Sequence, residues 1–473
     1  MNGNKTNFII FGGTGDLSYR KLLPALYNLF VVDENRDINV ICIGRRAYTF
    51  EDYIEIIKPW IEKNSRVEFT EDKFLEFIKK IKYCVMDFTN KDEYHILSNY
   101  LKDLNVTENI FYLAVAPRFF NVIGEGISKL TFAGGSKIVI EKPFGETLNE
   151  ANLLNQNLEK WFSKENVYHI DHYLGKEMVQ NLLTVRFSNP IFSKNWNKES
   201  IECIQIIASE EEGVGTRAGY YDQSGALKDM VQNHLMQILS IVAMESPDEN
   251  NSIKSRQVEV LKQLKSVEEI DVEKHMILGQ YNGYLNEDNV AENSSTETLA
   301  FCKLYVDNER WSGVPFYILT GKALKSRELN VIVTFKSENG GEPNVLTFKI
   351  QPTEGVTLSF NIKKPGTFKD QLSMNMDHLQ SNIPSYQINT PEAYEGLFVA
   401  IMECDHTLFA NWEQIYASWI YIDKLKNKFK EKNLKLINYD KTSILPDLMQ
   451  GVLDNKSHFC DYSQFNSNLE RKE

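Results

Sequence analysis

The sequence predicts an α/β domain followed by a larger α+β domain, and three observations lead to this fold class. The chain has 473 residues, whereas a single hydrophobic core usually stops growing at about 250 to 300 residues. The first third alternates short β-branched runs with helical patterns, and the part beyond about residue 180 contains consecutive strand patterns without helices between them. We therefore expect an amino-terminal doubly wound parallel sheet within residues 1–175 and a mostly antiparallel sheet with helices within residues 176–473.

The expected strands of the first domain are short and almost continuously apolar. Such runs are typical of parallel strands that helices cover on both faces, because neither face of the sheet then meets water. They lie at residues 7–11, 39–43, 83–85, 110–115 and 137–140, and a shorter run at 167–170 predicts a further strand.

The second domain combines long helical patterns with alternating apolar and polar residues. A long helix is expected at 221–244. Strands are expected at 330–336, 344–350 and 356–362, where the alternation has the period that strands require. A helical pattern then runs from residue 391 to residue 425, and we assign no structure to the tail that follows.

Composition and charge exclude several classes of function. The formal net charge of −13 argues against a nucleic-acid partner, since neutralising phosphates requires a basic face. No apolar run approaches the roughly 18 residues that cross a bilayer, so we expect no membrane association. The first residues lack the pattern of a secretory signal, and we expect a cytoplasmic protein. Six cysteines are scattered singly and are expected to be reduced core residues: Cys42, Cys84, Cys203, Cys302, Cys404 and Cys460.

A glycine-rich loop lies directly between the first expected strand and a helical pattern. Gly12, Gly13 and Gly15 precede Ser18, which stands where a third glycine or alanine is usual. Glycines at this position let the backbone approach a pyrophosphate, and the amino terminus of the next helix stabilises its charge. This context favours a dinucleotide-binding domain of the Rossmann type, and a plain tight turn is the alternative.

Two arginines, Arg45 and Arg46, follow the second expected strand. A cofactor with a free 2′-hydroxyl normally meets Asp or Glu at this position, whereas a cation suits the 2′-phosphate of NADP. We therefore predict NADP as the cofactor and favour Arg45, which comes first after the strand. A solvated surface pair is the simpler alternative.

The stretch EKPFG places Lys142 at the end of the fifth expected strand. Open α/β sheets bind ligands at this edge, and Pro143 keeps the lysine out of helical geometry. Lys142 could therefore reach both a cofactor and a substrate oxygen, although a lysine that ends a strand is often only solvated.

The stretch VYHIDHYLGKE concentrates polar groups in one short segment. If its strand continues past residue 170, alternation directs His169, Asp171 and Tyr173 to one side and His172 to the other. The two histidines then diverge, whereas a metal ion needs ligands that face a common point. We therefore expect no metal site.

His234 lies on or beside the apolar stripe of the expected helix at 221–244. A histidine in such a place is most often a hydrogen-bonded core residue. It would act as a general base if a carboxylate fixed its tautomer and stabilised its charge. Asp171 is a candidate for that carboxylate across the domain junction, but the sequence does not show contact.

Several motifs, in one order along nearly the whole chain, resemble those of the glucose-6-phosphate dehydrogenase family. They are GGTGDL, FYLAV, IEKPFG, IDHYLGKE, RAGYYDQSGALKDMVQNH, RWSGVPFY and IQPTEG. IDHYLGKE is the strongest match. Dehydrogenases of the glucose-fructose oxidoreductase type also join a Rossmann domain to an open sheet and use an EKP lysine, but they lack this motif. One departure is His169, which stands where the family has arginine.

The resemblance implies an NADP-dependent dehydrogenase that oxidises the C1 hydroxyl of glucose 6-phosphate to 6-phosphoglucono-δ-lactone, the first step of the oxidative pentose phosphate pathway. It implies that His234 is the catalytic base and that Asp171 supports it. The residues implied to bind the substrate are Lys142, His172, Tyr173, Lys176, Glu210, Asp229, Lys322 and Arg327. Those implied to bind the cofactor are Gly12, Gly13, Thr14, Gly15, Asp16, Leu17, Arg45, Ala114 and Lys142.

The family is usually dimeric or tetrameric, so the resemblance also implies a homodimer or a homotetramer. The non-enzymatic alternative is a sensor or scaffold of the same fold that binds NADP without turnover. Intact Lys142, Asp171, Lys176 and His234 argue against that alternative.

Overall fold

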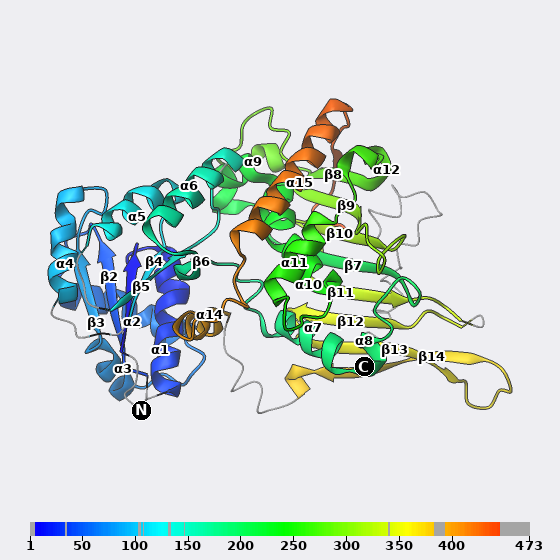
Figure 1. The fold of residues 1–473 in the computed structure, drawn as a ribbon, viewed down its shortest axis with the longest axis horizontal. Helices are drawn as coiled ribbons and strands as arrows, with labels where there is room; N and C mark the ends of the chain where they lie inside the picture. The colour runs from blue at the N-terminus through cyan, green and yellow to red at the C-terminus, as the bar shows by residue number, and fades with distance from the viewer. Residues whose placement is uncertain are drawn as a thin grey trace. The chain divides into compact units, whose positions relative to one another are not determined.

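The computed structural model describes residues 5–33, 36–102, 106, 108–130, 134–145, 147–338, 341–382 and 393–444. The chain forms two compact units (Figure 1). Unit 1 comprises Met1–Glu177 and Ile388–Trp412, and unit 2 comprises Met178–Gln387 and Glu413–Glu473. The sequence predicted a single boundary at residue 175, and the return of the chain to the first unit was not predicted.

Among the described residues of unit 1, six strands form a parallel sheet in the order β3-β2-β1-β4-β5-β6. They are β1 (Thr6–Phe11), β2 (Ile38–Gly44), β3 (Ile81–Val85), β4 (Glu108–Leu113), β5 (Gly135–Ile140) and β6 (Val167–His169). Their side chains are mostly buried, as the apolar runs predicted. The chain starts in the middle of the sheet and builds outward on both sides, so the expected doubly wound parallel sheet is confirmed.

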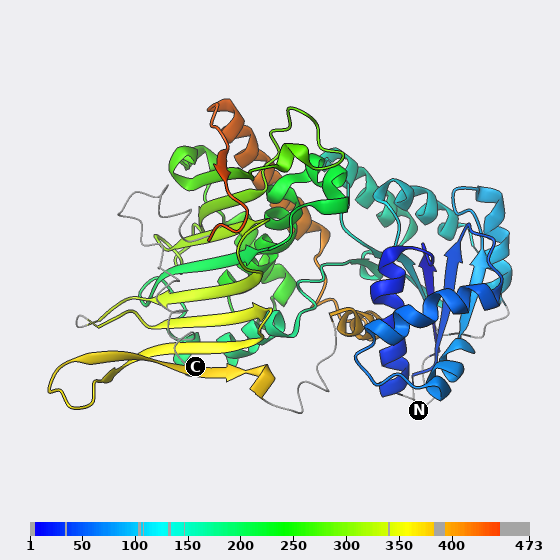
Figure 2. The ribbon, with the colours of Figure 1, turned by 180° about the vertical axis from the view of Figure 1, so that it is seen from behind.

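Helices connect these strands, and α1, α2 and α3 pack together as one group while α5 and α6 form another (Figures 1 and 2). Helix α2 begins with a capping box in which Thr49 and Asp52 exchange hydrogen bonds of 3.1 Å. The helices are η1 (Ser18–Leu22), α1 (Leu23–Val32), α2 (Phe50–Asn64), α3 (Glu71–Ile78), η2 (Lys91–Glu93), α4 (Tyr94–Lys102), η3 (Pro117–Phe119), α5 (Phe120–Ser128), α6 (Leu148–Trp161) and η4 (Lys164–Asn166).

Unit 1 also contains a segment from late in the chain. Helix α14 (Ala393–Met402) packs on α1, and its Phe398 ring lies 5.1 Å from the ring of Phe8. Glu395 of the same helix is 1% exposed and forms an ion pair with Arg66 at 2.7 Å. A buried carboxylate needs such a partner, because its desolvation is costly. The aromatic contact and the ion pair together fix this segment in unit 1.

Among the described residues of unit 2, nine strands form one sheet in the order β14-β13-β12-β11-β7-β10-β9-β8-β15. Neighbours are antiparallel except for two parallel pairs, β7 with β10 and β8 with β15. The mostly antiparallel sheet is therefore confirmed. The strands are β7 (Ile201–Ser209), β8 (Met276–Tyr281), β9 (Leu299–Tyr305), β10 (Pro315–Gly321), β11 (Glu328–Phe335), β12 (Val345–Gln351), β13 (Gly355–Lys363), β14 (Gln371–Leu379) and β15 (Ile437–Tyr439).

The helix predicted at 221–244 consists of three consecutive pieces, namely α9 (Ala218–Ala226), the π-helical η6 (Leu227–Leu235) and α10 (Met236–Ala243). Gly225 interrupts it with a φ of +70°. A side chain at this position would collide with the carboxylate of Glu297, since a Cβ would lie 2.4 Å from its Oε1. The break therefore depends on glycine and sets where η6 begins.

Unit 2 contains further helices, of which α10, α11 and α15 lie in front of its sheet in Figure 1, while Figure 2 shows the other face. The α-helices in this part of the described chain are α7 (Glu177–Ser188), α8 (Pro190–Ser193), α11 (Ile253–Lys262), α12 (Val272–His275) and α15 (Trp412–Glu431). The short ones are η5 (Gly215–Arg217), η7 (Val267–Glu269), η8 (Tyr284–Asn286) and η9 (Gln380–Asn382).

Two predictions from composition can be compared with the structure. The described cysteines are buried with one exception, since Cys404 is exposed where α14 ends. The prediction of a core residue was therefore wrong for Cys404, because it lies in a turn, and Cys460 lies outside the described residues. In the part of the chain that the structure describes, no helix has the length and apolar character needed to span a membrane.

Candidate functional site

The glycine loop lies between β1 and η1 at the carboxyl edge of the first sheet. The N–H groups of Gly12 and Gly13 both donate to the carbonyl of Ile43, at 3.1 and 2.8 Å. Gly12 has a φ of +88°, and a Cβ there would lie 2.4 Å from the carbonyl oxygen of Ala114. At Gly13 a Cβ would lie 2.6 Å from the Cβ of Cys42. Only glycine allows these approaches, so the loop packs directly against the ends of β2 and β4.

Ser18 replaces the third glycine of the loop motif without loss of packing. It is fully buried, and its hydroxyl donates to the carbonyl of Gly12 at 2.9 Å. Serine is small enough to keep the helix close to the strand, and its hydrogen bond holds the turn. The other predicted loop residues follow in the same turn, where Asp16 pairs with Arg20 at 2.7 Å.

Arg45 and Arg46 begin the loop that joins β2 to α2, and both are exposed. Asp87 lies on the same edge, after β3. Hydrogen bonds from Thr89 and, to a smaller extent, the charge of Arg45 lower the pKa of Asp87. Arg45 is thus a cation at the end of β2, the strand next to the one that leads into the glycine loop. This is the place where a nucleotide 2′-phosphate is recognised in such folds.

Lys142 and Asp171 pair at the ends of two neighbouring strands. Because β5 and β6 are parallel neighbours, the residues after them emerge at the same edge. The Nζ of Lys142 donates to Oδ2 of the fully buried Asp171 at 2.8 Å. The N–H of Tyr173 donates to Oδ1 of Asp171 at 3.0 Å. The motifs EKPFG and IDHYLGKE, which were treated separately in the sequence, therefore share a buried ion pair.

Glu141, for which the sequence predicted no role, lies beside this pair. The hydroxyls of Tyr112 and Tyr394 both donate to its Oε1, the second at 3.2 Å. Burial raises the pKa of Glu141, while these hydrogen bonds and the charge of Lys142 oppose the rise. Glu141 thus links the end of β5 to the returning segment that carries Tyr394. No sequence signal indicated this link, because it depends on how the late segment packs.

The strand predicted at 167–170 ends at His169, and residues 172–176 form turns. The predicted alternation of side chains beyond residue 170 was therefore wrong, because the backbone is no longer extended. The rings of His172 and Tyr173 lie 4.8 Å apart, and the Nζ of Lys176 lies 5.8 Å from the centre of the Tyr173 ring. The turn thus gathers three of the predicted substrate residues on one short segment of unit 1.

His169 is a core histidine of unit 1. It is 5% exposed, its ring packs edge-on against Phe144 at 5.0 Å, and its backbone bridges to Ala410. Burial lowers the pKa of His169 to about 3. The side chain is therefore neutral in the folded chain near neutral pH, which gives this residue a packing role.

Glu210, Lys322 and Arg327 gather at one end of the sheet of unit 2. Strands β7 and β10 are parallel, so Ser209 and Gly321 are partners and the residues that follow them emerge side by side. Glu210 and Lys322 form an ion pair, and the Nζ of Lys322 lies 5.0 Å from the centre of the Tyr221 ring. Arg327 is exposed directly before β11, whose first residue pairs with Ser209. These three predicted substrate residues therefore share one edge of the sheet.

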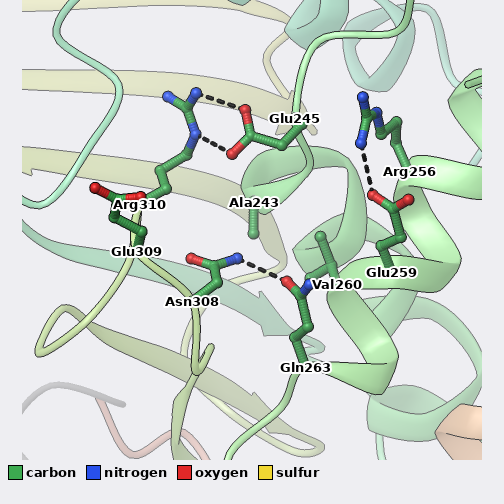
Figure 3. Close-up of a pocket in the computed structure, with 9 residues that line it drawn as sticks. All are labelled: Ala243, Glu245, Arg256, Glu259, Val260, Gln263, Asn308, Glu309 and Arg310. Carbon is green, nitrogen blue, oxygen red and sulfur yellow. Dashed lines mark hydrogen bonds and ion pairs between the residues drawn. The ribbon is translucent and has the colours of Figure 1, made fainter.

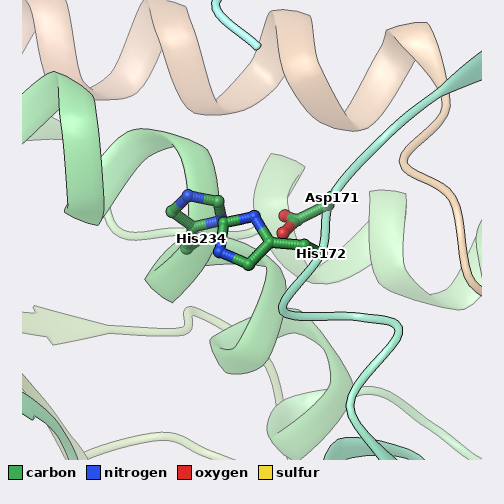
Figure 4. A group of neighbouring side chains, drawn as sticks. All are labelled: Asp171, His172 and His234. Atoms are coloured by element: carbon green, nitrogen blue, oxygen red, sulfur yellow. The ribbon is translucent and has the colours of Figure 1, made fainter. Parts of the chain in front are cut away.

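Asp229 and His234 both lie on η6, which packs against β10. The carboxylate of Asp229 accepts a hydrogen bond from the hydroxyl of Tyr220 at 3.4 Å. His234 is 6% exposed, as expected for a residue on or beside the apolar stripe. Figure 4 draws His234 on this helical segment and draws Asp171 and His172 on the segment that follows β6. The pairing of Asp171 with His234 stays a prediction, as does the expected absence of a metal.

Glu297 anchors the start of η6. Its carboxylate is 2% exposed, forms an ion pair with Lys426 at 3.1 Å and accepts a hydrogen bond from the N–H of Leu227 at 3.3 Å. A carboxylate near a helix amino terminus is stabilised by the N–H groups there. Glu297 and Lys426 were not predicted, because they are distant in sequence and belong to no motif.

A pocket of about 230 Å³ lies elsewhere in unit 2, between α11 and the segment before β10 (Figure 3). Four of its charged side chains form ion pairs, with Arg310 bound to Glu245 at 2.5 Å and Arg256 bound to Glu259 at 2.9 Å. None of the predicted site residues lines this pocket. The predicted site residues therefore lie at one edge of the sheet of unit 1 and, separately, at one edge of the sheet of unit 2 and on η6.

Comparison with known proteins gives the same result for both units. The model described as "Glucose-6-phosphate dehydrogenase, NAD binding domain" matches residues 9–181. The model described as "Glucose-6-phosphate dehydrogenase, C-terminal domain" matches residues 183–461. The two matches together cover most of the chain.

Curated relatives and solved structures agree with these matches. The glucose-6-phosphate 1-dehydrogenase of Bacillus subtilis (strain 168) is 39% identical, over 93% of this chain and 95% of its own length. That of Borreliella burgdorferi is 37% identical, over 96% and 97%. A solved glucose-6-phosphate dehydrogenase in complex with its substrate glucose 6-phosphate is 31% identical, with a TM-score of 0.87 over 95% of this chain and 97% of that one.

The burial of His169 predicts a specific loss of stability in acid. Its pKa is about 3 in the folded chain and about 6.5 when unfolded, so below about pH 6.5 the unfolded state binds the extra proton. Its contribution is therefore present above about pH 6.5 and is lost as the pH falls. We expect the free energy of unfolding to drop by about 2 kcal/mol between about pH 7 and pH 5 from this residue alone.

Urea unfolding of the wild type and of His169→Phe at both pH values measures this effect. The Phe variant should lose less stability on acidification than the wild type, whatever its stability at neutral pH. His95→Gln, which changes an exposed histidine on α4, serves as the control. It should lose as much free energy of unfolding on acidification as the wild type. If the wild type and His169→Phe lost the same free energy of unfolding between the two pH values, His169 would not be the cause of the loss.

Proposed function

The chain belongs to the glucose-6-phosphate dehydrogenase family, and from this we propose that it oxidises glucose 6-phosphate with NADP to 6-phosphoglucono-δ-lactone. The observation that carries the proposal is the match of both family models, over residues 9–181 and 183–461. In the reaction, the C1 hydrogen leaves as hydride to the nicotinamide, the C1 hydroxyl loses its proton, and a C=O bond forms at C1. The chain is thus proposed to be a hexose-phosphate dehydrogenase.

We propose His234 as the base that takes the proton from the C1 hydroxyl. A neutral imidazole is suited to this step near neutral pH, and a carboxylate beside it would stabilise the imidazolium that forms. Asp171 is proposed to supply that carboxylate. Its ion pair with Lys142 at 2.8 Å supports an ionised carboxylate in a buried place, because a neighbouring cation favours the charged form.

We propose that the substrate phosphate is bound by His172, Tyr173 and Lys176. Their arrangement in one turn supports this, since a cation and polar donors together satisfy a dianion. The sugar hydroxyls are proposed to meet the residues at the edge of unit 2, which are Glu210, Asp229, Lys322 and Arg327. Lys142 is proposed to contact both ligands, because it lies at the carboxyl end of β5.

We propose that the cofactor is NADP, which accepts the hydride when bound. The glycine loop from Gly12 to Leu17 would receive the pyrophosphate, because it lies at the carboxyl end of β1, and its residues from Thr14 to Leu17 are at least partly exposed before η1. Ala114 would lie along the cofactor, since its carbonyl already packs against Gly12. Arg45 would bind the 2′-phosphate, and its exposure at the end of β2 supports this role.

Replacing the proposed base tests the catalytic assignment. We expect His234→Ala to lower kcat roughly a hundredfold to ten-thousandfold, because general-base catalysis contributes that much. The affinity for NADP should stay close to that of the wild type. The measurement is the absorbance of reduced nicotinamide with glucose 6-phosphate, together with calorimetric titration of NADP.

His275→Gln, which changes another histidine of unit 2 outside the proposed site, is the control and should retain full turnover. Wild-type protein that binds NADP but turns over no hexose phosphate would favour a sensor or scaffold. A His234→Ala variant with near-normal kcat would show that another group takes the proton.

Replacing Arg45 tests the choice of cofactor. We expect Arg45→Ala to lower kcat/KM for NADP about tenfold or more, because a charge-assisted contact to the phosphate is lost. The value for NAD should change little, since NAD has no 2′-phosphate. Lys63→Ala, at the end of α2, is the matched change of an exposed cation. Equal losses with both cofactors would contradict the assignment of Arg45.

We also propose that the chain forms a homodimer or a homotetramer through strand β14 and acts in the cytoplasm. The described part of β14 pairs with β13 along one side, and Leu372, Met374 and Met376 are 44 to 62% exposed along it. Apolar side chains on an edge strand favour pairing with a second copy, because a two-fold axis makes such an edge self-complementary. The single cysteines suit a reducing compartment.

Light scattering on the purified chain tests the oligomer. We expect a mass of two or four chains for the wild type, and a shift towards the monomer in Met376→Lys, because a buried lysine would have no partner at the interface. Ile191→Lys changes a residue of α8 with similar exposure, 65% against 62% for Met376, and should leave the mass unchanged. A monomeric wild type would contradict the proposal.

A further inference from the structure

Two stacked tyrosines, Tyr53 and Tyr83, contact the backbones of the two proposed cofactor loops. Their ring centroids are 4.4 Å apart, with 16° between the ring planes. Tyr53 is fully buried and Tyr83 is 8% exposed. Both hydroxyls are therefore directed to partners inside unit 1, and each partner is the backbone of a different loop.

The hydroxyl of Tyr53 donates to the carbonyl of Gly13 at 2.7 Å. Tyr53 lies in the first turn of α2, and the capping box of Thr49 and Asp52 fixes where this helix starts. The start of α2 thus holds the middle of the glycine loop through the hydroxyl of Tyr53. The loop that would receive the pyrophosphate therefore depends on a side chain that does not itself line it.

The hydroxyl of Tyr83 donates to the carbonyl of Arg46 at 2.7 Å. Tyr83 belongs to β3, so this bond ties the loop between β2 and α2 to the neighbouring strand. The N–H of Tyr48 donates to the same carbonyl at 2.9 Å. The peptide next to Arg45 is thus held from two sides, which limits where the Arg45 side chain can reach.

The two loops meet at Gly44, the last residue of β2. A Cβ there would lie 2.7 Å from the hydroxyl oxygen of Tyr83 and 3.0 Å from Cγ2 of Thr14. Thr14 belongs to the glycine loop, so both loops lie against the same glycine. Among the described residues, the Tyr83 hydroxyl itself is hydrogen-bonded only to the loop that carries Arg46.

The chemistry of the two phenols suits a permanent donor role. Burial raises the pKa of Tyr83 to about 12 and raises that of Tyr53 as well. Both hydroxyls therefore keep their protons at any pH at which the protein would work. Because the rings are stacked, displacing one ring would also displace the other.

We propose that Tyr53 and Tyr83 are positioning residues that hold the two ends of the cofactor site through the backbone. Tyr53 sets the glycine loop for the pyrophosphate, and Tyr83 sets the loop whose Arg45 selects the 2′-phosphate. The inference rests on the proposed NADP site, and it names Tyr83 as a residue that influences the selectivity of this site. Since NAD and NADP share the pyrophosphate, only the Tyr83 bond should bear on the choice between them.

Phenylalanine variants test this inference, because they remove one hydroxyl and keep the ring. Tyr83→Phe should lower kcat/KM for NADP about threefold to tenfold and leave the value for NAD nearly unchanged. Tyr53→Phe should lower both values by a similar factor, so that their ratio stays that of the wild type. In both variants, KM for glucose 6-phosphate should not change.

Two further variants separate positioning from general support. Tyr83→Leu removes the ring as well, so Tyr53 loses its stacking partner and both cofactors should weaken. Tyr421→Phe removes a buried hydroxyl of unit 2, which donates to the carbonyl of Lys265 at 3.2 Å. As the control it should leave the cofactor ratio unchanged. Thermal unfolding of each free variant shows how much of any change is lost stability.

The decisive quantity is the ratio of kcat/KM for NADP to that for NAD. An unchanged ratio in Tyr83→Phe, or an equal fall for both cofactors, overturns the positioning role. Arg45→Ala, measured in the same series, shows which part has failed. If it lowers the ratio and Tyr83→Phe does not, the NADP site stands and the positioning role is wrong. If Arg45→Ala has no effect on the ratio, the proposed NADP site fails and the inference fails with it.

Discussion

The parallel pairing of the strands of unit 1 is the constraint on which the rest of the structure depends. Parallel neighbours must emerge at the same edge, and each pair is joined by a crossover that passes over a face of the sheet. The residues after β1, β2, β4, β5 and β6 therefore converge, although they are separated by up to about 160 residues in sequence. The first or second residue after each of these strands belongs to the predicted site. In the order of the strands, these residues are Gly12, Arg45, Ala114, Lys142 and Asp171. Their convergence is a result of topology, and the individual side chains then decide what the edge can bind.

The rule that parallel strands end at the same edge also applies within the mostly antiparallel sheet of unit 2. Only a parallel pair can bring two strand ends together in one direction, and β7 with β10 is such a pair. It places Glu210 beside Lys322, which are 112 residues apart in sequence. The interruption at Gly225 and the buried Glu297 then set where η6 begins, and with it the positions of Asp229 and His234. Local backbone rules thus position groups that a search for motifs treats as unrelated.

The sequence predicted what depends on local pattern and missed what depends on packing between distant segments. The strands of unit 1 were predicted within a few residues, because buried parallel strands are continuously apolar. The alternation assumed beyond His169 was wrong, because a strand of three residues gives no signal for its end. The exposure of Cys404 was missed for a related reason, since composition does not show that a residue lies in a turn. The return of α14 to unit 1, the Tyr53 and Tyr83 stack and the pairing of Lys142 with Asp171 all require the three-dimensional neighbours to be known.

The charges at both edges follow one physical principle. Lys142 is paired with Asp171 inside unit 1, and Lys322 is paired with Glu210 inside unit 2. A buried or half-buried charge is costly unless it is paired, so each lysine is held in position by a carboxylate of its own unit. A polar ligand that reached these lysines would share or replace an existing partner, and the lysine would not need to be desolvated anew. Such a site binds with less reorganisation than one built from solvated cations, because the orientation of the ammonium groups is already set by the fold. Pairing within each unit therefore contributes both to the stability of the edges and to their readiness to bind.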